Sequence, residues 1–282
     1  MERTAEGAQA LASLESARAG SSAGEPKMVW AVPCDCTAVD RTERALAKAR
    51  VPERYRHCDF ENYETDNEPE NATREQLDAW NRSLAQAKLV VQRFAAEFPI
   101  GAERGLLLMG PCGVGKTHLA VSVLKEVVLR GHTGIFYDYR DLLKQIQDSY
   151  NPESQATEMS VLEPVLKAEL LVLDDLGANK PSDWVRDTLG HVLNGRYNEN
   201  QKCVTVITTN FPDEEFASRL EARPSPWVTF PSGERARATD KDTLADRVGQ
   251  RIRSRLYEMC RTVEIWAPDY RKGPRSATSY RA

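Results

Sequence analysis

The residues with the clearest chemistry occupy positions 110–117, which read Gly-Pro-Cys-Gly-Val-Gly-Lys-Thr. The run satisfies the pattern Gly-x-x-x-x-Gly-Lys-Ser/Thr, whose glycines let backbone N–H groups approach phosphate oxygens closely. Lys116 can neutralise the β- and γ-phosphates, and the Thr117 hydroxyl can ligate Mg²⁺. A helix that begins at His118 directs its positive end at the same phosphates. The sequence therefore predicts a site that binds and hydrolyses ATP with Mg²⁺.

A second group of candidates follows the apolar run 170–173, where Asp174 and Asp175 stand in succession. Open parallel sheets bind ligands at the carboxyl ends of their strands. We expect Asp174 to hold Mg²⁺ together with Thr117, and Asp175 to orient or deprotonate the attacking water. The alternative is an acidic turn in which both carboxylates are merely solvated. The expected nucleotide-binding residues are Gly110, Pro111, Cys112, Gly113, Val114, Gly115, Lys116, Thr117, His118 and Asp174.

Asn210 and Arg255 complete the expected catalytic set with Asp175. Asn210 ends the β-branched run 203–209, where its amide is expected near the γ-phosphate and the attacking water. The alternative role of Asn210 is to begin the turn before Pro212.

Three arginines, Arg247, Arg251 and Arg255, recur at four-residue steps in a helix predicted over residues 243–260. We expect the three guanidinium groups to stack along one face. Like charges at this spacing destabilise an isolated helix, so an anionic partner is expected. One explanation is a solvated face with local carboxylates. In the other, Arg255 reaches the γ-phosphate of ATP held by a neighbouring subunit.

Alternating helices and short apolar strands must position these residues. Strands are predicted at 105–109, 134–139, 170–174, 203–209 and 262–266. Helices are predicted at 40–50, 73–98, 118–130, 142–150, 161–168, 182–198 and 243–260. Continuous apolar strands alternating with helices indicate an α/β fold with a parallel sheet covered on both faces. Residues 222–240, rich in Pro, Arg, Ser and Gly, are expected to form a mobile insertion.

The composition limits the cellular setting and the partners. The chain has 282 residues, a formal net charge of −4 and a pI near 5.7, which excludes a uniformly basic nucleic-acid coat but not a local basic face. No apolar run is long enough to span a bilayer, and the N-terminus does not have the pattern of a signal peptide. The six cysteines are scattered along the chain, which is typical of a protein in the reducing cytoplasm. We expect a partly disordered, partner-binding N-terminal extension at 1–50 and an ATPase domain at 51–282.

These motifs together resemble the AAA+ ATPases of the bacterial DnaC/DnaI helicase-loader and IstB group. The resemblance lies in the phosphate loop, the acidic strand end, the Thr-Thr-Asn at 208–210 and the Arg-Ile-Arg-Ser-Arg-Leu-Tyr-Glu at 251–258. The segment 51–63 also looks like the one that opens the ATPase domain of these loaders. The similarity covers roughly residues 51–271.

The resemblance implies a P-loop NTPase of the AAA+ type with a five-stranded parallel sheet sandwiched by helices. It also implies an ATP-dependent oligomer with ATP at its subunit interfaces, and binding to single-stranded DNA and the replicative DNA helicase. Arg255 matches the arginine finger of the group and Arg251 the preceding arginine, whereas Asp175 stands where many AAA+ proteins carry glutamate. The chain departs from the AAA+ pattern in showing no full lid; Arg271 is a candidate residual sensor.

Three functions remain open at this point. The leading hypothesis is a cytoplasmic helicase loader, which the segment 51–63 favours over an IstB-like transposition helper. A P-loop phosphotransferase is the third, although it leaves the arginine helix without a role. Separately, Cys34, Cys36, His57 and Cys58 offer four soft ligands for zinc, but the Cys-x-Cys spacing and the adjacent His-Cys pair disfavour a tetrahedral site.

Overall fold

The computed structural model describes residues 35–66, 72–99, 104–179, 181–198, 203–213 and 242–272, with side chains from residue 42 onward. The chain divides into two units, Met1–Val39 and Asp40–Ala282. The sheet, the helices that cover it and the candidate site belong to the second unit. Most of the expected N-terminal extension and the expected insertion at 222–240 lie outside the described residues. Within the described part of the chain, no helix is both long and apolar enough to cross a membrane.

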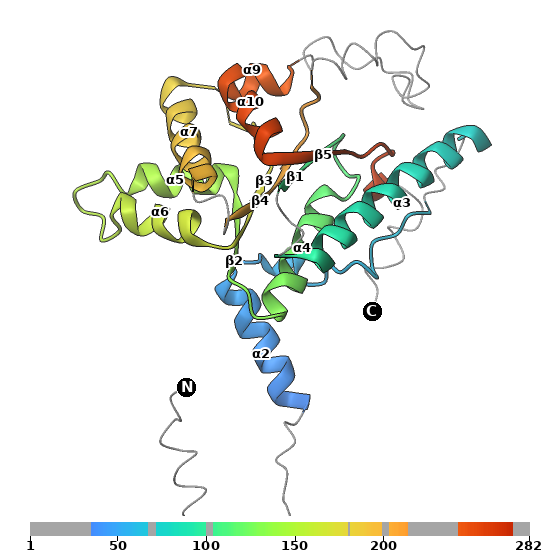
Figure 1. Ribbon diagram of the computed structural model, residues 1–282, viewed down its shortest axis with the longest axis horizontal. Coiled ribbons are helices and arrows are strands. Elements are labelled where there is room, and N and C mark those ends of the chain that lie inside the picture. The colour runs from blue at the N-terminus through green and yellow to red at the C-terminus, as the bar shows by residue number, and fades with distance from the viewer. Residues whose placement is uncertain are drawn as a thin grey trace, which may run out of the picture. The chain divides into compact units, whose positions relative to one another are not determined.

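Five parallel strands form one sheet in the order β2-β3-β4-β1-β5 (Figure 1). The strands are β1 (Gly105–Met109), β2 (Gly134–Asp138), β3 (Leu170–Asp174), β4 (Val204–Thr209) and β5 (Cys260–Glu264). This arrangement confirms the predicted five-stranded parallel sheet. Since all strands run the same way, their carboxyl ends meet at one edge, where ligands of such sheets bind.

Helices cover both faces of the sheet, as predicted (Figure 1). Successive side chains of a strand point to opposite faces, so Leu106 and Leu108 of β1 belong to one buried cluster and Leu107 and Met109 to the other. The first cluster includes residues of α3 (Arg74–Glu97) and α4 (Lys116–Leu129). The second includes residues of α5 (Tyr139–Asp148), α6 (Glu158–Lys167), α7 (Asp183–Asn198), α9 (Leu244–Val248) and α10 (Gln250–Met259).

Helix α3 begins with a capping box at Thr73. The Thr73 hydroxyl accepts a hydrogen bond from the Gln76 backbone N–H at 3.3 Å, and the Gln76 side chain accepts one from the Thr73 N–H at 2.9 Å. Two of the free N–H groups at the helix start are thereby satisfied. Trp80, Leu84 and Val91 then form part of the buried face of this helix.

The prediction of one continuous helix over 243–260 was wrong. Gly249, with φ +88°, separates α9 from α10, and α10 runs directly into β5. Glycine adopts this positive φ without the clash that a Cβ atom causes, so the helix can end and restart there. The three arginines therefore do not form one stripe. Arg247 pairs with Asp242 at 3.0 Å and lies over the ring of Phe211. Arg255 instead pairs with Glu258 and lies over the ring of Tyr197.

Arg196 of α7 is fully buried and binds neutral oxygen atoms of the core. Its guanidinium donates to the Thr205 hydroxyl at 2.9 Å and to the backbone carbonyls of Val165, Ala168 and Val204 at 2.6, 2.9 and 2.6 Å. Burial lowers the pKa of Arg196 to about 10, so the side chain stays charged at neutral pH. Its burial and these hydrogen bonds make Arg196 a structural link between α6, α7 and β4.

We expect Arg196→Leu to lower the free energy of unfolding by at least about 3 kcal/mol, because three carbonyls and a hydroxyl lose their donor inside the core. Urea denaturation of the full chain measures this change. Arg186→Leu on the same helix is the matched control, since its ion pair with Asp183 is exposed and should change stability by no more than about 0.5 kcal/mol. Equal stability of the two variants would contradict the structural role of Arg196.

Candidate nucleotide-binding site

The phosphate loop joins β1 to α4 at the carboxyl edge of the sheet, as predicted. Gly115 is the N-cap residue of α4 and has φ +86°. A Cβ atom on Gly115 would lie 2.5 Å from a ring carbon of Tyr63, so only glycine fits at this position. The Tyr63 hydroxyl also donates a hydrogen bond to the Val114 carbonyl at 2.9 Å. The lead-in segment (residues 51–66) thus braces the loop from one side.

Lys116 lies within the loop, with only 6% of its surface exposed. Its ammonium group donates to the backbone carbonyls of Gly110 and Pro111 at 2.8 and 2.7 Å. Burial lowers the pKa of Lys116 to about 8, so the amine is protonated in most molecules at neutral pH. A buried ammonium group beside the start of a helix is suited to a polyanion such as a triphosphate.

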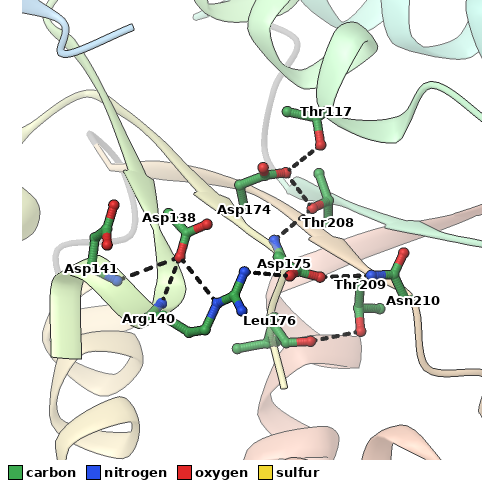
Figure 2. Close-up of polar contacts among 10 residues, drawn as sticks. All are labelled: Thr117, Asp138, Arg140, Asp141, Asp174, Asp175, Leu176, Thr208, Thr209 and Asn210. Atoms are coloured by element: carbon green, nitrogen blue, oxygen red, sulfur yellow. Dashed lines mark hydrogen bonds and ion pairs between the residues drawn. The ribbon is translucent and has the colours of Figure 1, made fainter. Parts of the chain in front are cut away.

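Asp174 connects the loop to two strands of the sheet (Figure 2). Its carboxylate, at the end of β3, accepts hydrogen bonds from the Thr117 hydroxyl at 2.8 Å and the Thr208 hydroxyl at 2.6 Å. Burial raises the pKa of Asp174, and the two hydroxyl donors oppose that shift. The Thr117 and Asp174 oxygens lie in direct contact, and hard oxygen ligands of this kind are what Mg²⁺ takes up in proteins. The residues predicted to hold Mg²⁺ therefore fit that ion.

Asp175 lies between two side chains that follow the strands flanking β3 (Figure 2). Asn210, after β4, donates to Asp175 Oδ1 at 2.6 Å, while an Arg140 guanidinium nitrogen lies 3.6 Å from Asp175 Oδ2. Asp175 has φ +58°, and its backbone N–H donates to the Thr208 hydroxyl at 2.9 Å. Burial raises the pKa of Asp175, and the charge of Arg140 lowers it. The structure thus brings together Asp175 and Asn210, two members of the expected catalytic set.

Arg140 also belongs to the site, although it was not among the residues expected from the sequence. It belongs to the first turn of α5, whose N-cap residue, Asp138, ends β2 and accepts from the Arg140 N–H at 2.9 Å. Because β2 pairs with β3, residues just after Asp138 lie beside those just after Asp174. The signal was therefore present in the sequence, as a charged residue directly after the strand 134–139, but only the strand order shows which carboxylate it reaches.

Arg255 is not joined to the other expected catalytic residues in its own chain. Its described contacts are an ion pair with Glu258 at 2.7 Å and a stacked position 4.0 Å from the ring centroid of Tyr197. Arg251, four residues earlier on α10, is exposed. Glu258 is thus a local carboxylate partner for Arg255, as one of the two explanations of the arginine helix expected.

The remaining loop residues have different surroundings. Cys112 is exposed. The ring of His118 bonds the Asp59 carbonyl at 2.7 Å and packs against Tyr63, so its side chain fastens α4 to the lead-in segment. Potential ligand atoms of His57, Cys58 and His118 all lie within 4.8 Å of one another. Cys58 is buried, which raises its pKa to about 11, while the side chains of Cys34 and Cys36 lie outside the described residues.

Comparison with known proteins places the chain among ATP-binding proteins. The family model described as "IstB-like ATP binding protein" matches residues 40–223. The chain is 24% identical over 218 residues to the replicative helicase loader DnaC of Escherichia coli K12, which covers 73% of this chain and 82% of that protein. It is 29% identical over 146 residues to the replicative helicase loader DnaI of Bacillus subtilis, which covers 51% of this chain and 45% of that protein.

Solved structures agree with this relationship. A crystal structure titled as the DnaC helicase loader matches with a TM-score of 0.54 and 30% identity, over 76% of this chain and 100% of that chain. A DnaI crystal structure matches in fold, with a TM-score of 0.52 and 22% identity over 78% of this chain and 94% of that chain. From the match of the family model over most of the chain, the fold and the complete phosphate loop, we conclude that this chain belongs to the family of IstB-like ATP-binding proteins.

Proposed function

We propose that this protein is an ATP-dependent DNA replication factor, a helicase loader that binds single-stranded DNA and the replicative helicase in the cytoplasm. The similarity to DnaC over 82% of the length of that loader is the observation that carries this proposal. In this proposal ATP acts as a switch, because its binding and hydrolysis alter contacts between proteins and leave no other chemical product. The ATPase domain is proposed to extend over residues 51–282.

Each residue of the candidate site has a role in this proposal. Lys116 and the backbone of 110–115 bind the phosphates, and Thr117 with Asp174 holds Mg²⁺, which neutralises charge on the phosphate oxygens. Asp175 accepts the proton of the attacking water or orients that water. The side chain of Asn210 keeps Asp175 in place through its 2.6 Å hydrogen bond. The Arg140 guanidinium, 3.6 Å from Asp175, favours the charged carboxylate that a base requires.

Two substitutions separate binding from turnover. We expect Lys116→Ala to weaken ATP binding by about 100-fold, since the loop loses its buried cation. Asp175→Asn should keep the ATP dissociation constant within about threefold but lower turnover by about 100-fold or more, because an amide cannot accept the proton. Binding of a fluorescent ATP analogue and phosphate release measure the two effects.

Asp141→Asn is the matched control for Asp175, because this neighbouring carboxylate of α5 is exposed and only the backbone N–H of Asp141 bonds to Asp138. Its turnover should equal that of the unaltered chain. Wild-type turnover by the Asp175→Asn variant would remove Asp175 from the catalytic role.

The proposed oligomer places Arg255 at the ATP of a neighbouring subunit. Within its own chain this arginine stacks on Tyr197 and pairs with Glu258, and it forms no hydrogen bond or ion pair with residues 110–117, all of which the structure describes. An arginine supplied from another subunit stabilises transition-state charge and makes hydrolysis depend on assembly. Arg251, exposed on the same helix, is proposed to serve the same interface.

Mixing of inactive variants tests the action of Arg255 between subunits. Arg255→Ala should bind ATP normally yet lose about 100-fold or more of its turnover. When it is mixed in equal amounts with Asp175→Asn, random assembly restores about one intact site in four, and turnover should recover to a comparable share. Arg261→Ala, at an exposed arginine of β5, is the control and should keep full turnover. No recovery in the mixture would rule out an Arg255 that acts in trans.

The family model itself supports a second candidate function. The model is described as an IstB-like ATP-binding protein, and the second candidate is therefore an IstB-like transposition helper ATPase. Such a protein would use the same site to switch its contacts with a transposase and DNA. The phosphate loop, Asp174 and Asp175 do not distinguish the two functions, because both require the same ATP chemistry.

Affinity capture distinguishes the partners. We expect Asp175→Asn with ATP, as bait, to retain the replicative DNA helicase, because the ATP-bound state persists when hydrolysis is slow. Lys116→Ala as bait should retain much less. Labelled single-stranded DNA should bind with an affinity that falls as salt rises, as phosphate contacts require. Capture of a transposase without the helicase would favour the second function, and transfer of phosphate to a small molecule without DNA stimulation would contradict both.

A further inference from the structure

Three side chains of the kind that bind transition metals meet where the lead-in segment passes the start of α4. They are His57 and Cys58 of the lead-in segment and His118 of α4, and their potential ligand atoms all lie within 4.8 Å of one another. Cys58 Sγ is 3.9 Å from His57 Nε2. Ligand atoms of a tetrahedral zinc site are about 3.5 Å apart, because Zn–N and Zn–S bonds are about 2.0 and 2.3 Å long. Small side-chain rotations therefore suffice to bring the three atoms within bonding distance of one ion.

The backbone on both sides of the adjacent histidine and cysteine is tied to α4. Lys125 of that helix donates to the Arg56 carbonyl at 2.8 Å and pairs with the Asp59 carboxylate at 2.7 Å. The ring of His118 bonds the Asp59 carbonyl at 2.7 Å. The lead-in segment and α4 are thus held together at the place where the three side chains meet, so little chain entropy opposes their joint binding of an ion.

The ring of His118 is oriented by two neighbours. The Asp59 carbonyl bonds it on one side, and the Tyr63 ring meets it edge-on with a centroid distance of 5.5 Å. Histidines that bind metals commonly donate one ring N–H to a backbone carbonyl and bind the ion through the other nitrogen. His118 therefore has the outer contact that is typical of a metal ligand.

The protonation states of the cluster suit a metal ion in different ways. Burial lowers the pKa of His118, so its ring is neutral at neutral pH, which is the form that binds metals. Burial raises the pKa of Cys58 to about 11, and its side chain is a thiol until a cation replaces the proton. His57 is exposed and gives the cluster an opening to solvent. An ion can therefore enter beside His57 and reach the buried sulfur.

The chemistry of the three ligand atoms selects the ion. Mg²⁺ and Ca²⁺ take oxygen ligands, whereas two imidazole nitrogens and one sulfur suit Zn²⁺. Three protein ligands leave the fourth tetrahedral position to a water molecule. The oxygens of Thr117 and Asp174 remain the pair suited to Mg²⁺, so the two kinds of ion are sorted by ligand type.

We propose that His57, Cys58 and His118 bind one Zn²⁺ ion that fastens the lead-in segment to α4. As the Zn–S bond forms, the Cys58 thiol releases its proton to solvent, and no oxidation or reduction takes place. Because His118 directly follows Thr117, the ion would brace the phosphate loop from the side of the lead-in segment. The inference goes beyond the proposed function and does not depend on the partner that the protein binds.

Titration of the full chain with Zn²⁺, after removal of metal and in competition with a coloured chelator, tests the site. We expect one Zn²⁺ per chain. His57→Gln, Cys58→Ser and His118→Gln should each weaken binding by about 100-fold or more, since loss of an outer contact alone costs about 10- to 100-fold. With Co²⁺ as the probe, the absorption band of a cobalt–thiolate bond should appear in the unaltered chain and be lost in Cys58→Ser.

Two other residues of the same types provide matched controls. His191→Gln alters an exposed histidine of α7, and Cys203→Ser alters a buried cysteine whose Sγ lies 3.5 Å from the Leu166 carbonyl oxygen. Both should keep the Zn²⁺ dissociation constant within about twofold. A chain with Cys34→Ser and Cys36→Ser together should also keep its affinity, because the proposed ligands are all retained.

Thermal unfolding checks that each variant is folded and gives a second readout. Zn²⁺ should raise the unfolding temperature of the unaltered chain and of the controls, because the ion binds the folded state. It should leave that of His57→Gln and His118→Gln nearly unchanged. His57 is exposed, so its substitution decides the outcome even if Cys58→Ser does not fold.

Weakened binding in the histidine variants together with full binding in the controls supports the site. Full affinity in His118→Gln overturns it, because the adjacent His57 and Cys58 then act without α4. Less than one Zn²⁺ per chain, or loss of binding only in the chain without Cys34 and Cys36, overturns it as well. A chain that binds Zn²⁺ as expected but does not bind ATP would defeat the proposed function and leave this inference standing.

Discussion

The nucleotide site depends on one buried carboxylate, that of Asp174. It accepts hydrogen bonds from Thr117 of the phosphate loop and Thr208 of β4, so a single side chain holds the loop, β3 and β4 in one arrangement. A buried carboxylate without such donors either becomes protonated or destabilises the fold. The same bonds that stabilise the charge therefore place a hydroxyl and a carboxylate oxygen in contact, and both are oxygen ligands of the kind that Mg²⁺ takes up in proteins.

The order of the strands determines what surrounds the neighbouring carboxylate. With β2 and β4 on either side of β3, Asp175 receives Arg140 from one neighbour and Asn210 from the other. One contact supplies charge, and the other supplies a directed hydrogen bond. Together they favour an ionised Asp175 against the effect of its burial, which raises its pKa. The chemistry of the site is thus a consequence of three adjacent strand ends rather than of one motif.

Two segments far apart in the sequence meet at the phosphate loop. The lead-in segment contacts the loop through Tyr63, whose hydroxyl donates a hydrogen bond to the Val114 carbonyl. Residues 265–272, which follow β5, contact it through Tyr270, whose N–H donates to the Gly113 carbonyl. The bond between Tyr270 and Glu64 joins these segments to each other. A change of charge in the loop can therefore alter the contacts of both segments. This is the kind of coupling that an ATP-dependent switch needs, since a ligand acts through contacts that differ between states.

The sequence by itself determined the phosphate loop, the acidic strand end and the parallel sheet, because these depend on local spacing and on short apolar strands that must be buried on both faces. It also placed Asp175 and Asn210 in one expected catalytic set. The prediction of one helix over 243–260 was wrong at Gly249. The spacing of the arginines is helical, but the positive φ of this glycine ends one helix and starts another. Only the tertiary structure decided the partners of Arg140, Arg196 and His118. Each of these side chains is held by groups brought close by strand order or chain crossing, and such distances are not encoded in any local run of residues.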